Sequence, residues 1–570
     1  MSGLREWIRE ARLFVGVSAL FIVGGATAFG QTGRITGRVV DPSGAAVSGA
    51  TVTHTKSDTN QQRTTQTSAD GYYDLSSLVP GTDSIRVQSA GFRPTVQNDI
   101  RLQVDQNLGL DLSLEIGAVN EQVVVEAQVP LLDTESHSVS QTVQGTQIIN
   151  LPLLGRNAYS LGALVPGVRV SRGMNDLPVD QISTASVSIN GAPGNANEFL
   201  LDGAPNTAAA QNQPIIYPNA DSVQEFRVET NNFSAEYGRA AGGIFNVVTK
   251  AGTNDLHGDL YEFLRNDKLN SNDFFANGAG RKIPPFKFNQ FGGVLGGPVV
   301  IPHLYDGRNK TFFFVSTELV RFVQGVTYTA TVPDPAQLTG NFSGLVNSSG
   351  QPVVIYDPST TVANGTGFTR TRFAGNRIPT SQINPVAAAI AQYWPAPNVT
   401  GAAVGASNYV RTDSNNIQKN TFSTRLDQNF SSNTRLLARY SYDDTPWARA
   451  SPYGLSDLGS PAFGPQDFTR YNSVAELDHV FSPSLISTIR VSYSRLANQR
   501  GPLSNGFDIT KLGLPASLAT EVGDPAAFPA IDITGYTVGS SVSNNSRTGT
   551  LGETGRIAFG MNNYALQANV

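Results

Sequence analysis

The chain has 570 residues with a net charge of −5, and only 15% of them are charged, against about 25% in a typical soluble protein. Its length suggests three or four domains, and its 56 glycines suit many short strands joined by polar turns. No run of Lys or Arg points to nucleic acid, and the absence of cysteine excludes disulfides, Cys-ligated zinc, a thiol nucleophile and a lipoprotein anchor.

Residues 1–30 have the pattern of a signal peptide. Arg5, Arg9 and Arg12 form a positive region, an apolar run from Leu13 to Val23 follows, and small residues come after it. The alternative is an uncleaved anchor, but the run is shorter than the ~20 residues of a spanning helix. Because no later segment reaches that length, we expect any membrane crossing to use strands.

Residues 33–115 are expected to form a β-sandwich, because short alternating segments are separated by turn signals such as Asp70-Gly71 and Pro80-Gly81. The stretches Gly37-Arg38-Val39-Val40-Asp41 and Ala69-Asp70-Gly71-Tyr72-Tyr73 resemble the carboxypeptidase regulatory-like domain. That resemblance implies a transthyretin-like fold, also called carbohydrate-binding-like, without catalytic activity.

Residues 116–130 are expected to be a linker that carries an extended, acidic and Val-rich segment. Three successive Val residues favour a strand, which can add to the sheet edge of a partner. The segment resembles a TonB box, which implies the energy-transducing protein TonB as a partner; the alternative is a last strand of the sandwich. Its residues are Glu121, Gln122, Val123, Val124, Val125, Glu126 and Ala127.

Residues 131–254 resemble the plug domain of TonB-dependent receptors, particularly the Oar-like branch. The resemblance rests on the stretches Leu151 to Asn157, Asn197 to Gly203, Val223 to Val228 and Ala235 to Asn254. A plug has a polar surface inside a barrel, and its charges either pair with the barrel wall or serve its own fold. The plug-motif residues are Asp202, Gly203, Glu225, Glu236, Tyr237, Gly238, Arg239, Gly242, Gly243 and Lys250, of which Glu236, Arg239 and Lys250 are the candidates for pairing with the wall.

Residues 255–570 show longer alternating strands. From Thr434 to Tyr442, Leu436 and Tyr440 lie on one face and Arg435 and Arg439 on the other, and 488–494 repeats the pattern. Strands with apolar side chains on the outer face and polar side chains on the inner face are typical of a barrel that crosses lipid around a lumen. A half-buried strand of a soluble sheet has the same period. Two successive hairpins with tight turns and aromatic residues near the strand ends favour the barrel.

A long polar segment from Gly325 to Gln418 fits an extracellular loop. Tyr393 and Trp394 are candidates for contact with a ligand; the alternative is that they hold the loop to itself. Only eight or nine strands can be read after Leu256, whereas a plugged transporter barrel of this kind has ~22. We therefore expect the chain to be a fragment, or a truncated form, of a larger barrel.

An enzyme is not expected. None of the five histidines stands in an HExxH or HxxE arrangement, and neither a GxSxG elbow nor a P-loop is present, although scattered Asp and Glu leave a carboxylate pair open. We predict no metal and no cofactor.

The fold class is therefore expected to be mainly β: a transthyretin-like sandwich, a plug, and the first part of a transmembrane antiparallel barrel. The resemblance implies a TonB-dependent receptor in the outer membrane, with the sandwich in the periplasm, that imports a large or scarce substrate such as a carbohydrate or peptide. Its expected partners are the TonB complex, outer-membrane lipid and an extracellular ligand. The alternatives are a surface adhesin or glycan-binding protein, or an Oar-like component of protein export.

Overall fold

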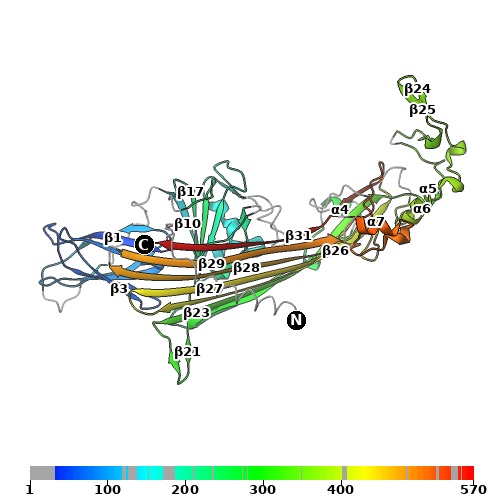
Figure 1. The fold of residues 1–570 in the computed structure, drawn as a ribbon. Coiled ribbons are helices and arrows are strands. Elements are labelled where there is room, and N and C mark those ends of the chain that lie inside the picture. Colours follow the sequence, from blue (N-terminus) through cyan, green and yellow to red (C-terminus); the bar gives the residue numbers. More distant parts are fainter. Residues whose placement is uncertain are drawn as a thin grey trace.

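A computed structural model describes residues 32–117, 123–125, 138–151, 153–170, 187–209, 212–233, 237–272, 274–278, 280, 282–347, 349–400, 407–482, 485–521, 526–540, 550–553 and 555–569. The expected signal peptide lies outside these residues, as do Glu121, Gln122, Glu126, Ala127 and Glu236. Within the described residues, a small sandwich stands at one end of a curved sheet of long strands, and the plug lies on one face of that sheet (Figure 1).

Two sheets form the sandwich. The first holds β1 (Gly33–Val40), β4 (Tyr72–Leu78), β7 (Asn107–Gly109) and β8 (Leu112–Ser113). The second has the order β3-β2-β5-β6-β9, with β2 (Thr51–Lys56), β3 (Gln62–Gln66), β5 (Gly81–Gln88), β6 (Thr95–Leu102) and β9 (Val123–Val125). Alternate side chains such as Ile35, Val52 and Ile85 fill the space between the sheets and are fully buried, which confirms the expected sandwich.

β9 comes from the segment that resembles a TonB box. It runs parallel to β6, with Thr95 opposite Val123 and Gln97 opposite Val125, and it is the edge strand of its sheet. In the described structure the centre of the segment is therefore a strand of the sandwich, as the alternative interpretation expects. On the side of β9 that faces away from β6, no further strand pairs with it among the described residues.

The plug is built on a five-stranded sheet of order β10-β17-β18-β13-β14, beside two short pairs, β11 with β12 and β15 with β16. Its strands are β10 (Val139–Gln144), β11 (Val168–Val170), β12 (Val187–Ile189), β13 (Glu198–Leu201), β14 (Ala204–Pro205), β15 (Thr207–Ala208), β16 (Gln213–Pro214), β17 (Val223–Asn231) and β18 (Ile244–Thr249). Its helices are α2 (Gly145–Asn150) and the 3₁₀ helices η1 (Leu154–Arg156), η2 (Ala158–Leu164) and η3 (Ala220–Ser222).

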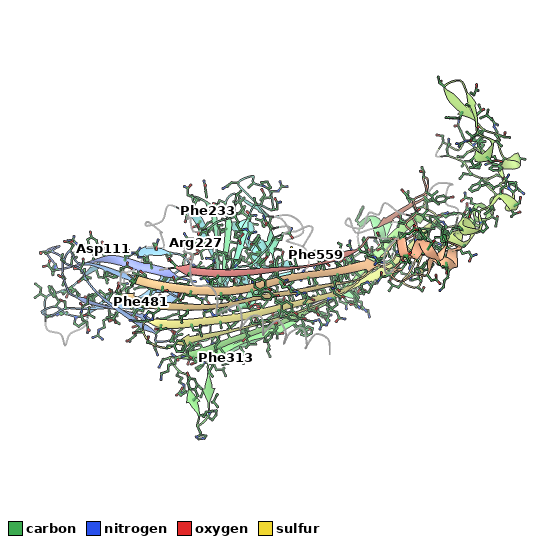
Figure 2. The ribbon with its side chains drawn as sticks, in the orientation of Figure 1. Asp111, Arg227, Phe233, Phe313, Phe481 and Phe559 are labelled. Atoms are coloured by element: carbon green, nitrogen blue, oxygen red, sulfur yellow. The ribbon has the colours of Figure 1, made fainter. Side chains whose placement is uncertain are left out.

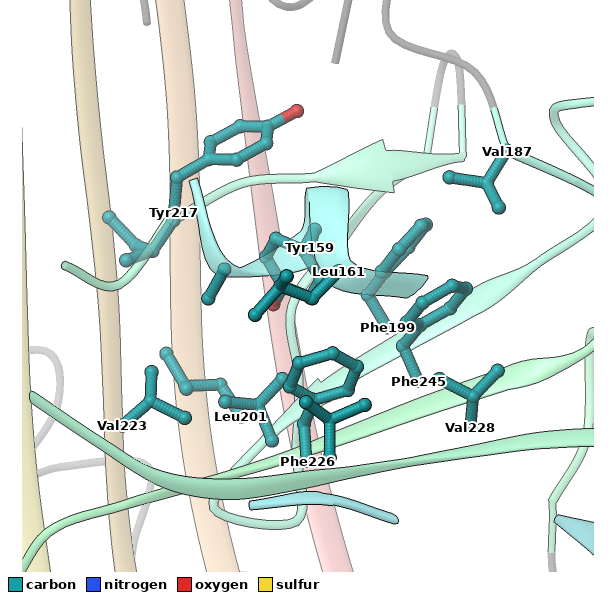
Figure 3. Close-up of a cluster of buried hydrophobic side chains, with 14 of the residues drawn as sticks. Tyr159, Leu161, Val187, Phe199, Leu201, Tyr217, Val223, Phe226, Val228 and Phe245 are labelled. Atoms are coloured by element: carbon teal, nitrogen blue, oxygen red, sulfur yellow. The ribbon is translucent and has the colours of Figure 1, made fainter. Parts of the chain in front are cut away.

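Aromatic rings fill the core of the plug (Figure 3). Phe199 and Phe245 stack with their centroids 5.0 Å apart, and Tyr159 meets the two rings edge-on at 5.4 and 6.1 Å. The Tyr159 hydroxyl accepts a hydrogen bond from Asn206 Nδ2 at 3.2 Å, so its polar end is satisfied. These rings pack the 3₁₀ helix η2 against the plug sheet.

The curved sheet, which we call the wall, has the order β19-β20-β23-β26-β27-β28-β29-β31, with β30 on the outer end of β23. All of its neighbouring strands are antiparallel, and the nine described strands lie within the expected number. They are β19 (His257–Asn266), β20 (Phe286–Pro298), β23 (Thr311–Thr331), β26 (Tyr409–Asn429), β27 (Thr434–Ala448), β28 (Phe463–Ser482), β29 (Leu485–Pro502), β30 (Thr537–Ser540) and β31 (Ile557–Asn569).

Short connections lie at the end of the wall near the sandwich: β26 to β27 and β28 to β29, the two hairpins expected from the sequence, and a small hairpin of β21 (Val300–Ile301) with β22 (Tyr305–Asp306). Long connections lie at the other end. Within them are α4 (Phe274–Gly278), α5 (Pro335–Leu338), β24 (Val362–Asn364), β25 (Gly367–Thr369), α6 (Pro385–Ala391), α7 (Ala516–Glu521) and the 3₁₀ helices η4 (Asp267–Leu269), η5 (Pro358–Thr360), η6 (Ala374–Asn376), η7 (Thr380–Gln382) and η8 (Ile509–Leu512). Short turns on one side and long loops on the other match the barrel pattern.

The two faces of the wall differ as the sequence predicts. On β27, Arg435, Arg439 and Ser441 are buried toward the plug, whereas Leu436 and Tyr440 point away from it. On the outer side, large apolar residues stay exposed, among them Leu260, Leu426, Ile489 and Leu566. An apolar outer face of this kind suits contact with lipid.

Aromatic side chains mark two levels on the outer face. Tyr442 packs on Tyr471 and Tyr493 on Tyr564, with centroid distances of 5.2 and 5.1 Å. Near the turns at the sandwich end lie Phe430, in the turn that follows β26, and Phe481, which Figure 2 labels. Above the tyrosine level the strands continue: β26 runs from Phe422 back to Tyr409, or ~40 Å at ~3.4 Å per residue.

None of the helices that the structure describes is long and apolar enough to cross a membrane.

Candidate functional site

Asp202 is the centre of the contact between the plug and the wall. It follows β13 with a φ of 47°, and it is 2% exposed. Thr249, at the end of β18, donates to its carboxylate from the backbone N at 2.9 Å and from Oγ1 at 2.8 Å. From the wall, Arg439 Nε donates at 2.6 Å and Arg425 Nη1 at 3.4 Å. Two guanidinium groups of β26 and β27 thus face one carboxylate of the plug.

Gly203 continues this contact, and its position favours glycine. Its φ is +68°, and a Cβ there would lie 2.4 Å from the guanidinium of Arg490. Arg490 Nη1 donates to the Gly203 carbonyl at 3.0 Å, and its Nε donates to Glu476 Oε2 at 2.6 Å. The Asp202–Gly203 turn is therefore held by three arginines of the wall.

Carboxylates and amides of the wall hold these arginines in place. Asp427 accepts from Arg425 Nε at 2.7 Å and from Arg435 Nη2 at 3.0 Å, while Arg439 Nη2 donates to Asn472 Oδ1 at 2.6 Å. All these side chains are at most 8% exposed. Removing one partner of such a buried pair typically costs ~3–5 kcal/mol, so the network ties the plug to one seating on the wall.

A second contact lies around Arg156. Its Nη2 donates to Asp221 Oδ2 at 2.6 Å within the plug, and its guanidinium lies over the rings of Tyr261 and Phe263 of β19, at 5.1 and 4.5 Å. Gln290 Nε2 of β20 donates to the neighbouring Gly155 carbonyl at 3.3 Å. The plug thus contacts β19 and β20 at one side of the wall as well as β26, β27 and β29 farther along it.

Lys250 and Arg239, two of the charges expected to pair with the wall, differ in their surroundings. Lys250 lies near Asp221 of the plug and Asp259 of β19; burial lowers the pKa of Lys250, while both carboxylates raise it. Arg239 is exposed, and it lowers the pKa of Glu198, which burial raises. Pairing of the plug with the wall runs mainly through Asp202, which the sequence marks only as a plug-motif residue.

Glu225 and Tyr237 contact the sandwich. Glu225 Oε1 accepts from the backbone N of Val104 at 2.6 Å, and the Tyr237 hydroxyl donates to Asp105 Oδ2 at 3.0 Å. Removal from water raises the pKa of Glu225 to about 7, against the lowering effect of Arg101. It also raises the pKa of Asp105. Two motif residues of the plug therefore form an interface with the N-terminal domain.

The glycines of the motif serve close packing. A Cβ on Gly242 would lie 2.4 Å from Asn197 Oδ1, and one on Gly243 would lie 2.5 Å from the Glu229 carbonyl. Asn197 is fully buried and accepts from the Gly243 backbone N at 3.1 Å. Gly238 has open space around it, so the structure gives no packing reason for that glycine.

Tyr393 and Trp394 lie in an aromatic cluster that joins the long connections. Trp394 is 8% exposed and packs near Tyr453 and Tyr536, with ring centroids 6.1 and 5.5 Å away, and Tyr393 packs on Phe528 at 4.7 Å. This position agrees with the alternative that the pair holds the loops together. Contact of either residue with a ligand stays a prediction.

Sequence reasoning missed the role of the wall arginines and the whole interface with the sandwich. A signal was present for the arginines: Arg435 and Arg439 alternate with apolar residues, a pattern that predicts a position on the lumen face. No signal marked Asp105 or Arg227 as interface residues. Within the described residues, no group of three or more His, Asp or Glu side chains is placed to hold a metal ion.

Comparison with known proteins gives two family matches. The model of the outer membrane beta barrel domain matches residues 248–564, and that of the carboxypeptidase regulatory-like domain matches residues 34–115. The TonB-dependent transporter Oar of Myxococcus xanthus is 26% identical over 329 residues, which are 55% of this chain and 28% of that protein. The chain thus spans less than a third of the length of this relative.

Two solved structures are similar to the chain at low scores. A mutant of the ferric enterobactin receptor from Pseudomonas aeruginosa, in complex with enterobactin, is 13% identical, with a TM-score of 0.35 over 64% of this chain and 42% of that chain. The siderophore receptor PirA from the same organism is 13% identical, with a TM-score of 0.28 over 65% of this chain and 51% of that chain.

The barrel model covers more than half of the chain and coincides with the wall, whose outer face is apolar and whose inner face holds the plug. The chain therefore belongs to the outer membrane beta-barrel family, is located in the outer membrane, and carries a carboxypeptidase regulatory-like domain in front of its plug and barrel strands.

Proposed function

We propose that the chain is part of a TonB-dependent receptor that imports a large or scarce solute through a plugged barrel. The observation that carries this proposal is the seating of the plug. Asp202 and Gly203 are held by Arg425, Arg439 and Arg490 in a buried network, and opening a path past the plug requires several of these contacts to break. Breaking several buried, charge-assisted hydrogen bonds together is unfavourable, so we propose that opening needs external work.

TonB, driven by the proton gradient of the inner membrane, is the proposed source of that work. It would capture the segment from Glu121 to Ala127 in the periplasm by strand addition. The position of β9 supports this proposal, because an edge strand presents one row of backbone donors and acceptors to a new partner. Carbohydrate or peptide is the proposed substrate class, with binding at the apex of the plug and on the long loops.

Site-specific cross-linking tests the proposal, and the 570 residues contain no cysteine that would compete with an introduced one. Single cysteines are placed along 121–127 of the full-length receptor in cells that carry a cysteine in the C-terminal domain of TonB. We expect a disulfide adduct at these positions and none at a control cysteine at Ser113, on the sheet that does not contain β9.

A backbone variant sharpens the test. Val124→Pro removes a backbone N–H from the segment and disrupts its pairing as a strand, whereas Val124→Ile keeps both the N–H and the preference for a strand. We expect the adduct formed from a cysteine at Gln122 to be lost with proline and kept with isoleucine. Equal adduct yields in the two variants, or no adduct anywhere along the segment, would reject the assignment.

A further inference from the structure

We infer that the N-terminal sandwich is a clamp that holds the plug against the rim of the barrel, and that the sandwich must release before the plug can move. The inference uses the proposed function only for the premise that the plug moves during transport. It stands on two sets of contacts, one from the sandwich to the plug and one from the sandwich to the wall.

The first contact is made by the turn that follows β6. The backbone N of Val104 donates to Glu225 at 2.6 Å, and Asp105 accepts from Tyr237 at 3.0 Å and from Asn246 of β18. In return, Arg227 Nη1 donates to the carbonyls of Val104 and Asp105 at 3.3 and 3.2 Å. Figure 2 shows Arg227 on the side of the plug that faces the sandwich. One turn of the sandwich is thus bound to two neighbouring strands of the plug sheet, β17 and β18.

The second contact is made by the turn between β2 and β3. The carbonyl of Asp58 accepts from the backbone N of Asn254, and Asn60 Nδ2 donates to Asn309 Oδ1, at 3.0 and 3.1 Å. Asn254 lies between the last plug strand and the first wall strand, and Asn309 lies just before β23. Arg63 of β3 lies near Asp478 of β28, which attracts it, and near Arg435 of β27, which repels it. The sandwich therefore also rests on the rim of the wall.

These contacts place the sandwich across the seam between plug and wall. If the plug moves relative to the wall, the sandwich must come away from at least one of them. The contacts described are hydrogen bonds and ionic attractions between side chains and backbone groups, and such contacts can break and form again without exposing a large apolar surface.

The same turn offers a path for force. β9 pairs with β6, and β6 ends one residue before the turn that carries Val104 and Asp105. A pull on the segment around β9 therefore reaches the plug contact through two strands of the sandwich. It does not have to act only through the chain that leads into β10. If a pull on the segment around β9 moves the plug, the sandwich would therefore be released from the plug at an early step.

The clamp is tested with a matched pair of substitutions in the full-length receptor. Asp105→Gly removes the carboxylate but tolerates the φ of 52° at this position. Asp99→Gly is the control, because Asp99 has a φ of 57°, is exposed and lies on the neighbouring strand β6. Hydrogen exchange of the peptide covering β17 is measured by mass spectrometry, and sensitivity of the cells to vancomycin reports leakage past the plug.

We expect Asp105→Gly to speed exchange in β17 at least tenfold over Asp99→Gly and to raise the sensitivity to vancomycin. Exchange equal in the two variants would overturn the clamp. A second measurement concerns the rim: in the cysteine-free chain, a short bifunctional maleimide should join Asp58→Cys to Asn254→Cys in the outer membrane, because the backbones of these residues are hydrogen-bonded. A failure of this pair to cross-link would equally overturn the inference. Neither measurement involves TonB, so each can fail while the cross-link to TonB succeeds, and the reverse.

Discussion

Replacing Asp202 by asparagine is the sharpest test of how the plug is seated. The amide keeps the shape of the side chain but removes the charge that Arg439 and Arg425 share, at 2.6 and 3.4 Å. Arg425 retains Asp427, whereas Arg439 retains only the neutral Asn472 among the contacts described above. We therefore expect a loss near the lower end of the range for a broken buried pair, ~3 kcal/mol.

This loss should appear as faster opening of the plug. Because ~1.4 kcal/mol corresponds to a tenfold change in an equilibrium constant, the plug should open roughly a hundred times more often. Hydrogen exchange of a peptide covering 244–248 measures this opening in the folded receptor. Thr249 is left out because its own amide donates to Asp202.

Asp443→Asn provides the control. Asp443 is also buried between two cations, Lys419 and Arg470, but all its contacts lie on the wall strands β26, β27 and β28. It should destabilise the wall without a selective effect on β18. If the peptide 244–248 exchanges at the same rate in Asp202→Asn as in Asp443→Asn, the plug is not seated through its carboxylate.

Three further outcomes follow from the structure. Gly203→Ala should lower the thermal midpoint of the receptor by more than Gly191→Ala does. Both glycines have a positive φ, but only at Gly203 would an added Cβ lie against a guanidinium. Equal midpoints would contradict the close approach of the wall to Gly203. Burial raises the pKa of Glu225 from 4.5 to about 7 and so favours its protonated form, and the stability of the β17 region should therefore fall as pH rises from about 4.5 through 7. The protection of β17 against hydrogen exchange, corrected for the intrinsic rate at each pH, should fall from pH 5 to pH 8 in the native protein and stay constant in Glu225→Gln. Trp394→Ala should cost ~3–5 kcal/mol of local stability and expose the connection between β23 and β26 to added protease, and an unchanged cleavage rate would show that the aromatic cluster does not hold the loops.

Local patterns are sufficient to predict the architecture. Side chains on a strand alternate with a period of two, so the amino-acid sequence alone places Arg435 and Leu436 on opposite faces of the wall. Turn signals such as Asp70-Gly71 locate the sandwich in the same way, because the geometry of a turn depends only on neighbouring residues.

The contacts between domains could not be predicted in this way. Asp202 meets Arg439 across 237 positions of the chain, and that meeting depends on the register of the wall strands and on the seating of the plug. The parallel pairing of β9 with β6 and the insertion of Asp105 between plug residues have the same character. Each of these contacts depends on how segments that are far apart in the sequence are placed relative to one another in space.

The height of the wall has a consequence for what the molecule can meet. The wall strands continue for tens of ångströms beyond the tyrosine level. The aromatic cluster around Trp394 packs the connections between them at the end away from the sandwich. A molecule that approaches the wall from that end therefore meets these packed connections before it reaches the plug.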